Sequence, residues 1–169
     1  MAGARLRQGL WLLPPVVAFT DLVAAVIRVD GASMRPTLNP DAGGGSDYVL
    51  VEKASVKLLR RYARGEVVVL WAPDDPHQQI IKRLLALEGD TIVDDTRAGT
   101  WTEVPRGRCW VEGDNPAMSS DSKSAYGPVH LGLLEGRVTH VVWPPERMGR
   151  VAARPQPERL LSTDRRPAG

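Results

Sequence analysis

Two residues in this sequence, Ser33 and Lys82, have a type and a setting that could support catalysis. Ser33 lies in the stretch GASMRPTL (31–38), where a serine would ordinarily be a turn or cap residue. Lys82 lies inside an apolar run, IIKRLLALEGD (80–90). Because a serine hydroxyl is a weak nucleophile, it needs a base to accept its proton. The sequence shows neither a GxSxG motif nor a plausible order of Ser, His and Asp, which leaves a Ser–Lys pair as the remaining option.

A lysine can act as a base only if its pKa falls towards the working pH. The ordinary pKa of lysine is about 10.4, and burial among apolar side chains lowers it by up to ~3–5 units. On a strand, Ile80, Lys82 and Leu84 would share one face while Arg83 points the other way. The pattern therefore allows a buried, neutral Lys82. A solvated pair of Lys82 and Arg83 at a sheet edge is the open alternative.

The elements that would position these residues are short and rich in valine. Runs bounded by Gly, Pro and Asp cover residues 47–53, 65–73, 80–90, 107–115 and 136–145. Such runs are typical of strands, so the sequence predicts a mainly β domain of coiled antiparallel sheets. The run around Lys82 could also be helical, because Leu and Ala favour helix. Its strand-like neighbours and the closing Gly89–Asp90 favour a strand.

The N-terminal part of the chain is apolar. Residues 9–27 have about the length that crosses a bilayer, roughly 20 residues, although two prolines and Asp21 interrupt them. We predict a membrane anchor over residues 1–28, with an amphipathic helix packed on the domain as the alternative. Two arginines precede the run, so the positive-inside rule places the bulk of the chain across the membrane. The catalytic domain is expected over residues 29–150, and residues 151–169 are expected to form a mobile C-terminal tail.

Composition and charge narrow the classes of function. The 169 residues allow one domain with an adequate core. The chain has 22 basic and 20 acidic residues, and its net charge of +2 is too balanced to indicate a nucleic-acid partner. The single cysteine, Cys109, cannot form an intramolecular disulfide, and the three histidines lack metal-binding spacing. We therefore expect neither a metal nor a cofactor.

Three stretches together resemble the boxes that characterise type I signal peptidases. GASMRPTL resembles the serine box of that family, IIKRLLALEGD the lysine box, and VEGDNPAMSSDS (111–122) the Gly-Asp-Asn…Ser-x-Asp-Ser box. Their order and spacing agree with the family, and the resemblance covers roughly residues 30–150. It implies a signal-peptidase-like catalytic domain of coiled antiparallel sheets, preceded by one N-terminal membrane-anchor helix. YGPVHLGLL followed by WPPER is most similar to the second-subunit branch of the mitochondrial inner membrane peptidases.

The resemblance implies catalytic roles for three residues. Ser33 would be the nucleophile, and its backbone N–H would lie in the oxyanion hole. Lys82 would be the general base and later the general acid. Ser119, the first serine of Ser-x-Asp-Ser, would hydrogen-bond Lys82 and orient its amine.

The resemblance also implies supporting residues. Arg83 and Asp114 would form an ion pair, and Asp121 would brace the same region together with Lys123. Met34 would help to line the substrate pocket, with simple core packing as the alternative. Composition alone would interpret GDNPAMSSDS as no more than a polar turn.

Two positions depart from the bacterial members of the family. Many of those carry a serine two positions before the nucleophile, and its hydroxyl completes the oxyanion hole, whereas this chain has Gly31. The loss of one such donor can cost ~10²–10³ in rate. Pro116 replaces an arginine that is common in bacterial members, so the contacts of that arginine do not transfer.

The resemblance implies a serine endopeptidase that removes apolar targeting or sorting segments from precursor proteins. It would lie in the mitochondrial inner membrane as a single-pass protein, with its catalytic domain facing the intermembrane space. Its partners would be the precursors, the membrane and a homologous peptidase subunit in a heterodimer. One alternative is a non-catalytic, membrane-anchored assembly subunit of such a complex. A soluble self-cleaving regulator is opposed by residues 1–30, which are too short and too apolar for a DNA-binding helix pair.

Overall fold

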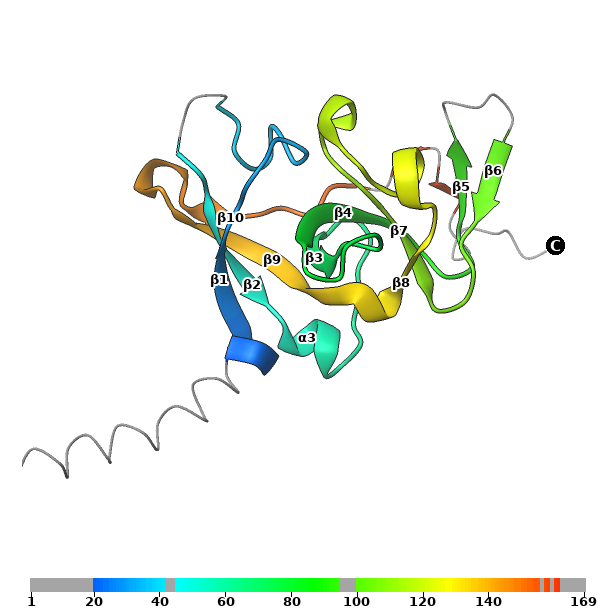
Figure 1. The fold of residues 1–169 in the computed structure, drawn as a ribbon, viewed down its shortest axis with the longest axis horizontal. Helices are drawn as coiled ribbons and strands as arrows, with labels where there is room; N and C mark the ends of the chain where they lie inside the picture. The colour runs from blue at the N-terminus through cyan, green and yellow to red at the C-terminus, as the bar shows by residue number, and fades with distance from the viewer. Residues whose placement is uncertain (1–19, 42–44, 95–99, 156, 159, 162–169) are drawn as a thin grey trace, which may run out of the picture.

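Antiparallel strands make up most of the regular structure (Figure 1). The computed structural model describes residues 20–41, 45–94, 100–155, 157–158 and 160–161. Its strands are β1 (Ala24–Arg28), β2 (Tyr48–Glu52), β3 (Val67–Trp71), β4 (Gln79–Leu87), β5 (Thr91–Asp94), β6 (Thr100–Glu103), β7 (Arg108–Glu112), β8 (Val129–His130), β9 (Leu134–Trp143), β10 (Gly149–Arg150) and β11 (Leu160–Leu161). The helical elements are short: α3 (Ala54–Lys57), three 3₁₀ turns (Pro116–Met118, Leu131–Leu133 and Pro145–Arg147) and a π-helix (Ser122–Tyr126).

The large sheet has eight strands in the order β1-β2-β9-β3-β4-β7-β8, with β10 paired to β9. A second sheet has the order β11-β5-β6, and every pairing between the described strands is antiparallel. Figure 1 shows the large sheet curled around β3, which lies between β9 and β4. The valine-rich β3 suits this central place because its side chains are covered on both faces. The predicted mainly β fold of coiled antiparallel sheets is confirmed.

Strand β4 carries both Lys82 and Arg83. It pairs with β3 on one side, where Val68 faces Lys82, and with β7 on the other, where Arg83 faces Glu112. Pairing on both sides satisfies the backbone of β4, and this tertiary context overrides the helix propensity of its Leu and Ala residues. The strand predicted around Lys82 is confirmed, and the helical alternative is wrong.

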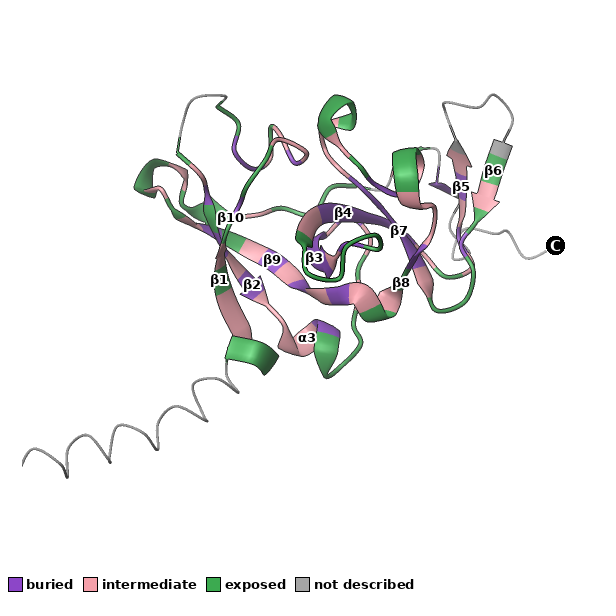
Figure 2. Cartoon of the chain, in the orientation of Figure 1, coloured by how far each residue is buried: buried purple, intermediate pink, exposed green. Residues whose placement is uncertain are grey.

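Three buried hydrophobic clusters hold the strands together (Figure 2). The first contains residues of β2, β3 and β9 and also Met34 and Leu38, which come from the turn after β1. The second contains residues of β3, β4, β7 and β9. The third joins Leu85 of β4 to Ile92 and Leu160 of the small sheet. Because a buried Leu or Val side chain contributes ~1.5–3 kcal/mol, the first cluster anchors the turn that carries Ser33.

The N-terminal apolar run ends in a strand. Residues 24–28 form β1, which pairs with β2 from Ala24 opposite Glu52 to Arg28 opposite Tyr48. The predicted boundary of the anchor at residue 28 is therefore wrong, because the β-branched end of the run extends the sheet. The rest of the predicted anchor, residues 1–19, lies outside the described residues. Among the residues that the structure describes, none of the helices is long and apolar enough to span a bilayer.

The C-terminal segment was expected to be a mobile tail, and its described part contradicts this expectation. The Val151 N–H donates to the carbonyl of Thr139, and the Arg154 N–H donates to the carbonyl of Gly65. Further on, Leu160 pairs with Ile92 in the small sheet and is only 3% exposed. Apolar burial and specific hydrogen bonds thus outweigh the proline content of this segment.

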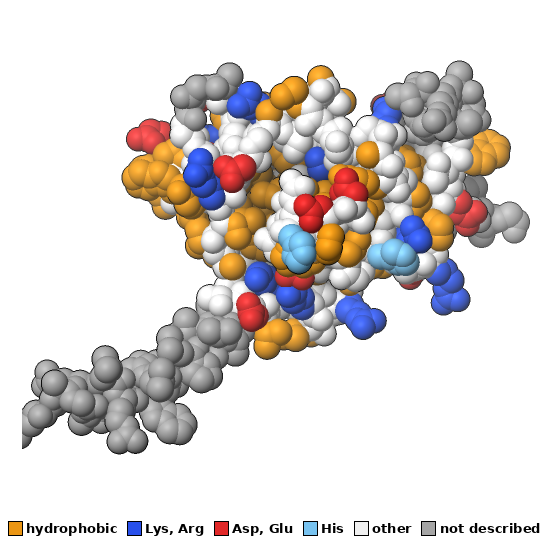
Figure 3. Space-filling model, in the orientation of Figure 1, with side chains coloured by type: hydrophobic (Ala, Val, Ile, Leu, Met, Phe, Trp, Pro, Cys, Tyr) orange, Lys and Arg blue, Asp and Glu red, His pale blue; other side chains and the backbone are white. Residues whose placement is uncertain are grey.

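Exposed hydrophobic side chains are found at the edge of the large sheet that contains β1, β2 and β9. They include Leu22, Val23 and Val26, together with Tyr48 and Trp143, which face one another across β2 and β9. Figure 3 shows hydrophobic side chains exposed on the same side of the molecule as β1 and β10. On the face in that view, positive and negative side chains are interspersed, and neither sign forms a continuous patch.

Candidate active site

A cavity of about 590 Å³ brings together the residues for which catalysis was predicted. Residues 27–34 line it from β1 and the following turn, and residues 79–82 line it from β4 together with the preceding Gln78. Its wall therefore contains Ser33, Met34 and Lys82, with Ser120 and Tyr126 contributed by the segment after β7. Residues 49 positions apart in the chain thus face the same cavity.

The backbone around Ser33 is held by the Gly-Asp-Asn stretch that follows β7. The Asn115 N–H donates to the Ser33 carbonyl at 2.9 Å, and the Asn115 side-chain amide donates to the Ala32 carbonyl at 3.2 Å. Gly113 lies so close that an added Cβ would overlap both the Ser33 carbonyl oxygen and the Ser119 hydroxyl. Only glycine fits there, because the turn and the Ser119 segment both approach its backbone.

Lys82 is buried, with 3% of its surface exposed. On β4 it lies between Ile80 and Leu84, and both of these side chains pack in the second hydrophobic cluster. Its Nζ donates to the Ser119 hydroxyl at 2.9 Å. The alternative of a solvated Lys82–Arg83 pair is wrong, because both side chains are buried and each has its own partner.

The surroundings of Lys82 lower its pKa. Burial removes water from the ammonium and lowers the pKa of Lys82 below its ordinary value. The negative charge of Asp121 acts in the opposite direction and is the smaller effect. The neutral amine is therefore more populated here than on a solvated lysine, as a general base requires.

Asp121 connects Ser119 to a turn that is held by hydrogen bonds. The Ser119 hydroxyl accepts from Lys82 and donates to Asp121 Oδ2 at 2.6 Å. The Asp121 carboxylate also accepts from the backbone N–H groups of Gly113, Lys123 and Ser124. Because these donors hold the carboxylate in place, the hydroxyl of Ser119 is oriented with a lone pair towards Lys82.

Arg83 points to the other side of β4 and pairs with Asp114. The pair is bidentate, with Nε to Oδ1 at 2.8 Å and Nη2 to Oδ2 at 2.7 Å, and both side chains are buried. Burial alone would raise the pKa of Asp114. Hydrogen bonds from Arg83 and Thr37, with the charges of Arg83 and Arg154, outweigh burial and hold the pKa of Asp114 below its ordinary value. Asp114 is therefore ionised at neutral pH.

Met34 and Gly31 both line the cavity. Met34 is only 3% exposed and belongs to the first hydrophobic cluster, yet it also contributes to the cavity wall. Its two predicted roles are therefore compatible. Gly31 has a φ of +86° and open space where a side chain would stand, so it supplies no hydroxyl near Ser33.

Cys109 cannot serve as a nucleophile in this fold. Its thiol is buried in β7, and burial raises the pKa of Cys109 to about 12. The thiol therefore stays protonated at neutral pH, and only the thiolate would react. Within the described part of the chain, no group of three or more His, Cys, Asp or Glu side chains could hold a metal ion.

Sequence reasoning missed four residues that surround the predicted ones. Gly113 and Asn115 flank Asp114 in the Gly-Asp-Asn stretch. Gly113 allows the close approach of the Ser33 turn, and Asn115 donates a hydrogen bond to it. Thr37 and Arg154 extend the Arg83–Asp114 pair. The stretch GDN was a visible signal for the first two, whereas nothing in the sequence connects Thr37 to Arg154.

The geometry can support proton transfer at a serine. Ser33 and Lys82 line one cavity, Ser119 and Asp121 orient the lysine, and the Arg83–Asp114 pair lies behind the turn. Every described side-chain nitrogen or oxygen that is buried has a hydrogen-bond partner. The chemistry that this arrangement allows is nucleophilic attack by a hydroxyl, with an amine as general base.

Comparison with known proteins identifies the family of this chain. Residues 6–98 match the family model described as signal peptidase, peptidase S26. The chain is 46% identical over 147 residues to "Mitochondrial inner membrane protease subunit 2" of Mus musculus, which covers 87% of this chain and 83% of the relative. The corresponding human protein is 47% identical over 148 residues, covering 88% and 83%. Human "Mitochondrial inner membrane protease subunit 1" is 35% identical over 143 residues, covering 83% and 82%.

Proposed function

Because the chain belongs to the signal peptidase family S26, we propose that it is a membrane-anchored serine endopeptidase that removes apolar targeting or sorting segments from precursor proteins. One observation carries this proposal. The buried amine of Lys82 is held by Ser119 in the wall of the cavity that Ser33 also lines. Burial of a lysine disfavours its charged form and therefore opposes folding at neutral pH, and a role as general base accounts for its position.

The proposed reaction is acyl transfer through Ser33. Its Oγ attacks the carbonyl carbon of the scissile peptide bond while its proton passes to the neutral amine of Lys82. The developing oxyanion accepts a hydrogen bond from the Ser33 N–H. As the C–N bond breaks, the Lys82 ammonium gives its proton to the leaving amine. Water then attacks the acyl ester while Lys82 accepts its proton, the bond between the acyl carbon and Ser33 Oγ breaks, and Lys82 returns the proton to Ser33 Oγ.

Arg83, Asp114 and Asp121 are proposed as supporting residues. Asp121 fixes Ser119, which orients the amine of Lys82. Arg83 and Asp114 support the turn that carries Ser33 from the opposite side of β4. Met34 is proposed to line the pocket for the substrate residues that precede the scissile bond.

The second candidate is a non-catalytic assembly subunit of such a peptidase complex. Gly31 favours it, because this position lacks the hydroxyl that completes the oxyanion hole in many bacterial relatives. The oriented, buried Lys82 opposes it, since an assembly subunit would have no use for a buried amine beside a cavity.

We propose that the chain acts at the mitochondrial inner membrane as a single-pass protein whose catalytic domain faces the intermembrane space. The names of the mouse and human relatives support the location. The exposed side chains of Leu22, Val23 and Val26 continue the apolar run towards β1, which suits a domain held at the bilayer surface. We also propose a heterodimer with a homologous subunit, because relatives named subunit 1 and subunit 2 both match this chain.

The experiment that tests this function is reconstitution of the full chain with a subunit-1-type partner in lipid vesicles. The substrate is a vesicle-tethered precursor with an apolar segment followed by small side chains. We expect cleavage just after that segment, observed as a smaller product by electrophoresis and mass spectrometry. A complex that assembles and leaves a set of such precursors intact would favour the assembly subunit instead.

Replacement of Ser119 by alanine should lower the cleavage rate by roughly ten- to a hundredfold, because a hydrogen bond to a charged group contributes about 1.5–3 kcal/mol. The amine of Lys82 would then lose the acceptor that orients it. Binding of the chain to vesicles should not change. Initial rates at saturating substrate and a flotation assay measure the two quantities, and normal turnover in the variant would remove the role of Ser119.

A further inference from the structure

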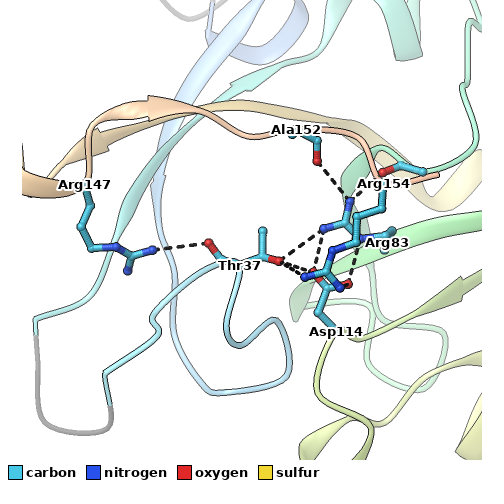
Figure 4. Close-up of polar contacts among 7 residues, drawn as sticks. Thr37, Arg83, Asp114, Arg147, Ala152 and Arg154 are labelled. Carbon is cyan, nitrogen blue, oxygen red and sulfur yellow. Dashed lines mark hydrogen bonds and ion pairs between the residues drawn. The ribbon is translucent and has the colours of Figure 1, made fainter.

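The Arg83–Asp114 pair is the centre of a larger cluster (Figure 4). The Thr37 hydroxyl donates to Asp114 Oδ2 at 2.5 Å and accepts from Arg154 Nη2 at 2.9 Å. The guanidinium of Arg154 also lies 3.3 Å from Asp114 Oδ1. Figure 4 shows Thr37 and the two arginines converging on the carboxylate of Asp114. The cluster thus joins the turn of Ser33 to the C-terminal segment.

The C-terminal segment is held across Gly65 by its backbone. The Arg154 N–H donates to the Gly65 carbonyl at 3.1 Å, and that carbonyl also accepts from Arg83 Nη1 at 2.6 Å. Gly65 has a φ of +86°, and an added Cβ would overlap the Arg154 carbonyl oxygen. Ala152 contributes a further acceptor to Arg83. Residues 152–154 therefore have a defined place next to the cluster.

The segment after β7 forms hydrogen bonds with both ends of the Ser33 turn, at Ser33 and at Thr37. Asn115 binds the carbonyl of Ser33, and the adjacent Asp114 binds the hydroxyl of Thr37. Arg147 also donates to the turn, at the Thr37 carbonyl. Since Thr37 lies only four residues after Ser33, a shift at Thr37 would move the nucleophile relative to Lys82.

The contacts of Arg154 suggest why a second arginine is present. Arg83 is buried and already neutralises Asp114 through two hydrogen bonds. Arg154 is 47% exposed, so its longer contact with the carboxylate adds little to that neutralisation. Its shorter bond is to the Thr37 hydroxyl. Arg83 Nη2 reaches the same hydroxyl only at 3.5 Å, so the main contribution of Arg154 is to fix Thr37.

We propose that Arg154 and Thr37 are positioning residues of the peptidase. Through their hydrogen bond, the C-terminal segment 152–154 holds the nucleophile turn at the position that attack by Ser33 requires. This inference rests on the proposed function and extends it to a part of the chain that lies outside the cavity. Misplacement of a reacting group by about 1 Å can cost ~10²-fold in rate, so a small displacement of the turn is measurable.

The test compares Arg154→Ala, Arg154→Lys and Thr37→Val in the full chain with its partner in vesicles. We expect kcat to fall about tenfold in Arg154→Ala and in Thr37→Val, with KM unchanged because neither residue lines the cavity. Arg154→Lys should recover part of the loss, since an ammonium can still donate to Thr37. The double variant should be no slower than the worse single variant, as expected for two residues that act through one bond.

The matched control is Arg150→Ala, which removes the same charge from an exposed position on β10. It should keep the kcat of the unchanged protein. If Arg150→Ala slows cleavage as much as Arg154→Ala, the effect is one of general charge and the proposal is overturned. A double variant whose losses simply multiply would overturn it too, because Thr37 and Arg154 would then act separately.

A second measurement does not depend on activity. The N–H groups of Arg35 and Leu38 are hydrogen-bonded within the turn, to the carbonyls of Ala32 and Met34. Their hydrogen exchange should be faster in Arg154→Ala and unchanged in Arg150→Ala. Unchanged exchange together with unchanged kcat in Arg154→Ala would overturn the proposal. A wild-type complex that cleaves nothing would instead contradict the proposed function, while the exchange rates would still decide whether Arg154 holds the turn.

Discussion

Replacement of Ser33 by alanine should abolish cleavage of the tethered precursor, with a loss of about 10⁴-fold or more, as for other serine peptidase nucleophiles. Without the hydroxyl, no acyl ester can form, and the remaining cavity can only bind the substrate. The fold should persist, because the contacts of the turn run through the Ser33 carbonyl and through Met34 and Leu38. Cleavage rate and thermal unfolding measured on the same preparation separate these two effects.

Ser46→Ala is a suitable control, because Ser46 lies in the segment before β2 and is not part of the cavity wall. It should cleave at the unchanged rate. If Ser33→Ala retained cleavage while Ser46→Ala behaved normally, another group would have to be the nucleophile. Loss of cleavage accompanied by unfolding would point to the turn as a structural element only.

Replacement of Lys82 by arginine should have an equally large effect, although it preserves the positive charge. Arg does not lose its proton in proteins, so it cannot accept the proton of Ser33. Lys82→Met should also be inactive, because its thioether is no base. Substrate binding should remain in the methionine variant, and fluorescence anisotropy of a labelled precursor peptide measures it. Cleavage by either variant would exclude Lys82 as the base.

The methionine variant also tests the lowered pKa of Lys82, because that pKa predicts how the variant changes thermal stability at each pH. The pKa of Lys82 is lower in the folded state than its ordinary 10.5, so the unfolded chain binds this proton more tightly. Burial of Lys82 therefore opposes folding below the folded-state pKa, and this opposition fades as the pH rises towards 10.5. Lys82→Met should raise Tm at pH 7 and lose that advantage at alkaline pH. Lys53→Met, outside the cavity, should show neither change.

The local patterns of the chain predicted much of the fold. Valine-rich runs between Gly, Pro and Asp became β2, β3, β7 and β9, because alternation and β-branched residues determine strands locally. The end of the apolar run was misjudged, since hydropathy does not distinguish a membrane helix from a strand such as β1. The C-terminal segment was misjudged because its order depends on Gly65 and Ile92, which are distant in sequence.

In the site too, local sequence patterns predicted some residues, whereas contacts between distant residues could not be predicted. The apolar setting of Lys82 was visible in IIKRLLAL, and the structure brings this lysine together with Ser119. The resemblance to signal peptidases, and not the spacing, suggested Ser119 as its partner. Thr37 and Arg154 could not be predicted, because they meet across 117 positions through a hydrogen bond that no pattern encodes.

The central claim is that Lys82 is a neutral amine near the pH at which the protein works, and the pH at which it loses its proton tests this most directly. The chain has only four lysines, so ¹³Cε labelling yields a simple NMR spectrum, in which the signal missing from Lys82→Met identifies Lys82. We predict a titration midpoint clearly below the ordinary 10.5, with the rate of cleavage rising through the same pH range. A Lys82 signal that titrates at or above 10.5 in the folded complex would contradict the account.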